Sequence, residues 1–171
     1  MAYVLIFLMF VVSLAVQGSV LALVGTSGTH PDILLVVTVG LALLMGARRG
    51  AIVGLCAGLL QDILFGAPLG FFAAIKMLTG ALAGMMSDDI YKDFTLAPMV
   101  LMLVFTLFSD IFTFFLTQLY HIQLPLSLLS YLREYTLLRM VMQFFIMGLI
   151  YPYLYRAQKR GLLLTVRDSE E

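Results

Sequence analysis

Six apolar segments separated by clusters of charge make up most of this chain. A bilayer core of about 30 Å is crossed by a helix of about 20 mostly apolar residues, so each segment is a candidate span. The segments cover residues 3–24, 31–46, 50–65, 69–86, 97–119 and 135–155, and a tail of residues 156–171 follows. The pattern predicts an all-α, polytopic integral membrane protein with six transmembrane helices, forming a single domain over residues 1–171.

The composition argues against a soluble enzyme. Charged residues make up only 12% of the 171 residues, whereas soluble domains carry about 25%. Ten basic and ten acidic residues cancel, so no basic surface for nucleic acid is expected. One cysteine and two histidines do not make a structural zinc site, and no catalytic or phosphate-binding motif occurs. We therefore expect no enzyme activity, no metal and no cofactor.

The distribution of lysine and arginine predicts the orientation in the membrane, because positively charged loops stay in the cytoplasm. With six spans, one side carries Arg48, Arg49, Lys92, Arg156, Lys159 and Arg160, and the other carries Arg133. We expect both termini in the cytoplasm. The last three residues of the first set, in the tail, are placed to contact anionic lipid headgroups or a cytoplasmic protein.

Glycines recur every fourth position on two neighbouring segments. Gly50, Gly54 and Gly58 share one face of the third segment, and Gly80 and Gly84 share a face of the fourth. Such strips let helix backbones approach closely. They predict either packing inside the protein or an interface with a partner helix.

Four ionisable residues fall inside the apolar segments, where each needs a partner or water. They are Asp62, Lys76, Asp110 and Arg139. Because Asp62 and Lys76 flank a turn at residues 66–70, they are expected at similar depth and could pair. Asp110 and Arg139 form a second possible pair, and Gln143 lies one turn beyond Arg139. Two interpretations remain open: ion pairs that only neutralise each other, or a polar cavity or partner site on the outer side.

The order of these signals resembles a known family. Pro31 and Asp32 open the second segment, Gly58 and Asp62 lie in the third, and the turn and fourth segment add Gly66, Leu69, Gly70 and Gly80. This order resembles the rod shape-determining protein MreD family, and Asp110 in the fifth segment agrees with it. The resemblance covers nearly the whole chain and is most specific in residues 31–84.

The resemblance implies a non-enzymatic scaffold in the bacterial inner membrane, within the rod complex or elongasome. Such a protein binds MreC and helps to couple MreB filaments to peptidoglycan synthesis by RodA and its transpeptidase partner, and so to cell shape. The family's fold is also similar to the S-components of energy-coupling-factor transporters, which bind vitamins in an outward-facing cavity. A vitamin-binding S-component is therefore the alternative function.

Overall fold

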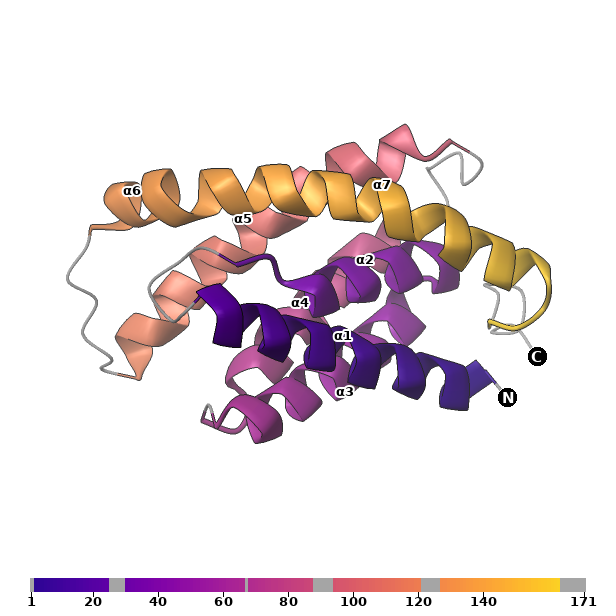
Figure 1. Ribbon diagram of the computed structural model, residues 1–171, viewed down its shortest axis with the longest axis horizontal. Coiled ribbons are helices and arrows are strands. Elements are labelled where there is room, and N and C mark those ends of the chain that lie inside the picture. The colour runs from indigo at the N-terminus through magenta and orange to yellow at the C-terminus, as the bar shows by residue number, and fades with distance from the viewer. Residues whose placement is uncertain (1, 25–29, 67, 88–93, 121–126, 164–171) are drawn as a thin grey trace.

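The structure, a computed structural model, describes residues 2–24, 30–66, 68–87, 94–120 and 127–163 (Figure 1). Within these ranges the chain is helical apart from short connections, and no strand occurs. The helices are α1 (Ala2–Val24), α2 (Ile33–Met45), α3 (Ala47–Phe65), α4 (Phe71–Met85), α5 (Leu96–Leu119), α6 (Leu128–Tyr131) and α7 (Leu137–Lys159), with a π-helical turn, η1 (Leu132–Thr136), between the last two. The predicted all-α class is confirmed.

Helix α2 is the centre of the molecule. All of its residues from Leu34 to Met45 are buried, and it packs against α1, α3, α4, α5 and α7, with α1 and α7 on either side of it in Figure 1. Its 13 residues span only about 20 Å. A helix this short suits a membrane protein when protein, and not lipid, surrounds its ends.

Three helical stretches of the described residues are long and apolar enough to cross a membrane: Ala2–Ser19, Leu96–Leu119 and Leu128–Lys159. Helices α2 and α4 are apolar but shorter, and α3 carries Arg48, Arg49 and Asp62. This helical content is consistent with a polytopic membrane protein.

Two helix boundaries differ from those expected from the charges. Helix α3 begins at Ala47 and not at residue 50, because Gly46 alone, at φ 86°, separates it from α2. Arg48 and Arg49 therefore lie in the first turn of α3 and not in a loop. In addition, α6, η1 and α7 follow one another without a break, so the polar stretch before residue 135 extends the last helix.

The glycine strips pack α3 against α4. A Cβ on Gly50 would lie 2.5 Å from the Gly80 carbonyl oxygen, and one on Gly84 would lie 2.5 Å from that of Gly46. A Cβ on Gly54 would collide with the Lys76 carbonyl, and one on Gly58 with the backbone of Phe72 and Ala73. Of the two predicted roles, packing inside the protein or an interface with a partner helix, the glycine strips therefore have the first.

The long helices run between two ends of the molecule. The start of α1, the Gly46 junction and the end of α7 lie toward the right of Figure 1, and we name this the Gly46 end. The turn between α3 and α4, the end of α5 and the start of α6 lie toward the left, which we name the Gly66 end. At the turn, Gly66 and Gly70 adopt φ of 68° and 98°, the left-handed region that glycine enters without strain.

Candidate functional site: a polar cavity and an apolar groove

Lys76 pairs with Asp32, and the predicted pairing with Asp62 is wrong. The Lys76 ammonium lies 2.5 Å from Asp32 Oδ2, and the lysine side chain is fully buried. The other carboxylate oxygen of Asp32 accepts a hydrogen bond of 2.8 Å from the Leu35 N–H and caps α2. One carboxylate therefore begins the central helix and neutralises a cation on α4.

Asp62 instead caps the start of α4 from a neighbouring helix. Its carboxylate accepts hydrogen bonds from the backbone N–H groups of Gly70 and Phe72, both at 2.8 Å, and of Ala73 at 3.3 Å. The first N–H groups of a helix lack partners within it, and α4 has no side-chain cap of its own. A negative charge there is also favoured by the helix dipole. Asp62 is thus satisfied without a cation.

Asp110 and Arg139 form the second predicted pair, which is confirmed. The Arg139 guanidinium donates to Asp110 Oδ1 at 2.6 Å, and so joins α5 to α7. One turn further along α7, the side-chain amide of the fully buried Gln143 is hydrogen-bonded to the Thr106 hydroxyl. The threonines at 106, 113 and 117 also bond carbonyls four residues earlier in α5, so their hydroxyls are satisfied locally.

These polar groups meet in a partly open cavity of about 140 Å³. Its lining comes from α1, the residues leading into α2, and helices α2 to α7: Gln17, His30, Asp32, Leu35, Gln61, Phe72, Ser109, Asp110, Thr113, Tyr131, Arg139 and Gln143. We name it the polar cavity. It brings together Asp32, Asp110, Arg139 and Gln143, while Asp62 and Lys76 hold the helices around it.

Sequence reasoning named Asp32 only as part of the family motif, and it did not predict Gln17 and Gln61 as residues of the cavity. Asp32 directly precedes an apolar run, which is the usual position of a helix N-cap and a detectable signal. Gln17 and Gln61 are polar residues within apolar segments, but nothing in the sequence shows that α1 and α3 turn them toward the same space.

The remaining predicted residues lie elsewhere. Leu69 is exposed at the α3–α4 turn, and Pro31 precedes the cap of α2. Arg156, Lys159 and Arg160 lie at the end of α7, where the Lys159 ammonium is 4.7 Å from the centre of the Tyr155 ring. Their contact with lipid headgroups or a cytoplasmic protein stays a prediction.

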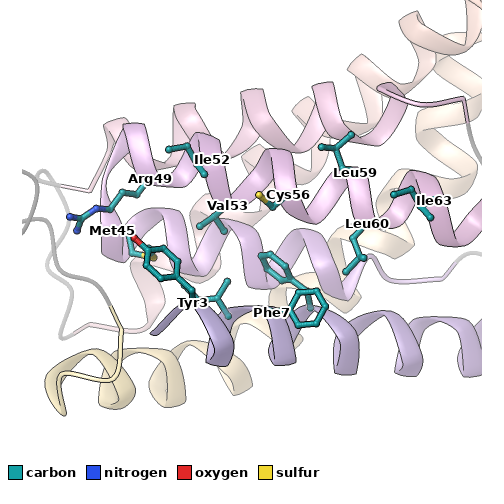
Figure 2. Close-up of a pocket in the computed structure, with 12 residues that line it drawn as sticks. Tyr3, Phe7, Met45, Arg49, Ile52, Val53, Cys56, Leu59, Leu60 and Ile63 are labelled. Atoms are coloured by element: carbon teal, nitrogen blue, oxygen red, sulfur yellow. The ribbon is translucent and has the colours of Figure 1, made fainter. Parts of the chain in front are cut away.

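A second hollow, an apolar groove of about 560 Å³, runs between α1 and α3. Figure 2 shows Tyr3 and Phe7 of α1 facing Val53 and Cys56 of α3, with Arg49 at one end. The full lining is Tyr3, Ile6, Phe7, Phe10, Met45, Arg49, Ile52, Val53, Cys56, Leu59, Leu60 and Ile63. Many of these large apolar side chains are exposed, including Tyr3, Phe7, Ile52 and Ile63. We name this the α1–α3 groove.

Comparisons with known proteins place this architecture in a family. The model of the family of the rod shape-determining protein MreD matches residues 1–161. Searches of curated proteins and of solved structures found no match. The family match covers nearly the whole chain and contains the Asp32–Lys76 and Asp110–Arg139 pairs, the glycine strips and the groove. The chain belongs to the MreD family of rod shape-determining proteins.

Proposed function

We propose that the chain is a non-enzymatic scaffold of the rod complex in the bacterial inner membrane, which binds MreC directly. Through MreC it helps to couple MreB filaments to RodA and its transpeptidase partner. Family membership, which implies a role in rod shape determination, is the observation that carries the proposal. The architecture supports it, because most described residues lie in helices, three stretches of which are long and apolar enough to cross a membrane, and contacts between helix faces are what such a chain can offer.

The proposed topology has six spans with both termini in the cytoplasm. The Gly46 end then faces the cytoplasm and the Gly66 end faces the periplasm. Arg48, Arg49 and the basic end of α7 all lie at the Gly46 end, as the positive-inside rule requires. The polar cavity, which lies toward the Gly66 end, is then in the outer half of the protein.

The α1–α3 groove is the surface that we assign to MreC, whose single membrane helix would lie along it. The glycine strips are already used between α3 and α4 and cannot serve a partner. The groove follows α3 from Arg49 to Ile63, which is about 21 Å or four helical turns. A helix placed there contacts α1 and α3 together, and so gains the close packing that drives helix association in lipid.

The alternative, a vitamin-binding S-component, is less well supported. Pockets for vitamin-sized ligands usually measure about 300–1,000 Å³, and the polar cavity measures about 140 Å³. The α1–α3 groove is larger, but its lining is apolar and lacks the converging polar groups that fix a water-soluble ligand.

Co-purification tests the proposal. The chain is co-expressed with MreC of its host and, separately, with the motor of an energy-coupling-factor transporter, and the purified complexes are analysed by native mass spectrometry. We expect a stable complex with MreC. Recovery with the motor and a vitamin-sized ligand, but never with MreC, would refute the scaffold proposal.

Two single substitutions, one in the groove and one outside it, test whether MreC binds in the α1–α3 groove. Cys56 is an exposed residue in its lining, so Cys56→Phe fills the space that the MreC helix would occupy. We expect MreC recovery to fall at least fivefold, since a difference of about 1 kcal/mol changes an equilibrium about fivefold. The control is Val104→Phe, which enlarges another exposed position, on α5 and outside the groove. Equal recovery with both variants would place MreC on another face.

A further inference from the structure

The polar cavity contains more hydrogen-bonding groups than the protein itself satisfies. Four buried atoms in its lining have no hydrogen-bond partner among the described residues: Gln17 Oε1, Gln61 Oε1, Arg139 Nε and Gln143 Nε2. The three glutamine side chains are nearly inaccessible, with 6%, 3% and 0% of their surface exposed. A buried polar atom without a partner destabilises the folded protein, because it has given up its hydrogen bonds to water. Four such atoms around one space therefore indicate an occupant that supplies the missing hydrogen bonds.

The unsatisfied atoms define the chemistry of that occupant. Two of them are acceptors and two are donors, so the occupant must offer both kinds of group. The charges around the cavity form two complete pairs, Asp32 with Lys76 and Asp110 with Arg139. Because no formal charge is left over in these pairs, the occupant has no net charge at the cavity.

The volume limits its size. About 140 Å³ is less than half of the roughly 300 Å³ at which pockets for drug-sized ligands begin, so the occupant is a small group. Glycerol is a small group with three hydroxyls, each of which both donates and accepts.

We propose that the polar cavity is a binding site for a small, uncharged polyhydroxyl group of about the size of glycerol. The group is either a free solute or the terminal part of a lipid headgroup, and the two share the same hydrogen-bonding chemistry. Gln61 and Gln17 accept hydrogen bonds from its hydroxyls, and Gln143 donates one. This inference does not rest on MreC binding, and the variants used to test it lie outside the α1–α3 groove.

The experiment measures thermal stability of the full chain in detergent against rising concentrations of four probes. Phosphatidylglycerol carries a terminal glycerol, and phosphatidic acid has the same tails and a phosphate but lacks it. Free glycerol is compared with 1,3-propanediol, which lacks one hydroxyl. The variant is Gln61→Leu, with Gln118→Leu, an exposed glutamine of α5, as the matched control. Gln17→Leu on α1 is a second variant that keeps the test usable if Gln61→Leu does not fold.

We expect a saturable rise in melting temperature with phosphatidylglycerol or glycerol that exceeds the rise with its matched probe. Loss of one hydrogen bond in Gln61→Leu or Gln17→Leu should raise the half-saturating concentration about tenfold, and Gln118→Leu should leave it unchanged. A response to phosphatidylglycerol alone identifies a lipid headgroup, and a response to glycerol identifies a free solute. Equal responses to matched probes, or responses that the glutamine variants do not change, would mean a hydrated cavity only and would overturn the proposal.

Discussion

Asp32 divides its two carboxylate oxygens between a helix start and a cation. Oδ1 accepts from the Leu35 N–H, and Oδ2 pairs with Lys76 on α4. The first bond holds the beginning of the central helix, and the second removes an unpaired charge from the protein interior. Asparagine could cap α2 but could not neutralise Lys76. The position therefore needs an acid, because α4 carries a lysine.

The Asp110–Arg139 pair gives a prediction at the same scale. Removing either residue leaves the other charge buried, and breaking such a pair costs about 3–5 kcal/mol. We expect Asp110→Ala and Arg139→Ala each to lower the thermal stability of the purified protein more than the double variant does. Arg133→Ala, at an exposed position of η1, is the control and should change stability little. Strictly additive losses in the double-mutant cycle would show that the two charges do not interact.

Among the elements, the hairpin of α3 and α4 has the least room for change. Gly54→Ala places a methyl group against the Lys76 carbonyl, and overpacking of this kind costs about 1–3 kcal/mol. We expect a lower melting temperature and a lower yield of folded protein. The matched control is Gly18→Ala on α1, where a Cβ meets nothing within 4 Å. If the two alanine variants melt at the same temperature, the backbones of α3 and α4 are not held as closely as the structure describes.

The helices and the glycine strips could be predicted from the sequence. The helices follow from the lengths of the apolar segments, and the strips follow from the spacing of the glycines. Gly50, Gly54 and Gly58 share a helical face in any α-helix, and the turn at Gly66 and Gly70 makes α3 and α4 antiparallel neighbours. Asp110 and Arg139 are the ionisable residues of the last two apolar segments, and their pairing was predicted correctly.

Similar depth in the membrane led to a wrong pairing of Asp62 with Lys76, because depth does not fix the direction in which each side chain points around its helix. Asp62 points to the free N–H groups at the start of α4, and Lys76 points to α2. The polar cavity could not be predicted for the same reason. Gln17 and Gln61 meet Gln143 only through the rotation of three helices that are distant in sequence.

At the scale of the whole molecule, the six-span topology predicts which ends face the periplasm. Alkaline phosphatase is active only outside the cytoplasm, so its insertion after Tyr120, at the end of α5, should give an active fusion. Insertion after Gly46 should give an inactive one, because this junction adjoins Arg48 and Arg49. Activities in cells, normalised to the amount of fusion protein, provide the measurement. The reverse pattern would invert the proposed orientation and place the polar cavity on the cytoplasmic side.

In the Asp32–Lys76 and Asp110–Arg139 pairs, the two residues are synthesised in a fixed order. Each joins residues far apart in the chain, 44 positions for Asp32 and Lys76 and 29 for Asp110 and Arg139. In both pairs the acid is the earlier residue, so ribosomal synthesis delivers it to the membrane before its base. Lys76 and Arg139 therefore enter a bilayer in which their counter-charge is already present. Lysine and arginine are among the residues that a bilayer accepts least readily. This order therefore shortens the time that either side chain spends in the bilayer without its counter-charge.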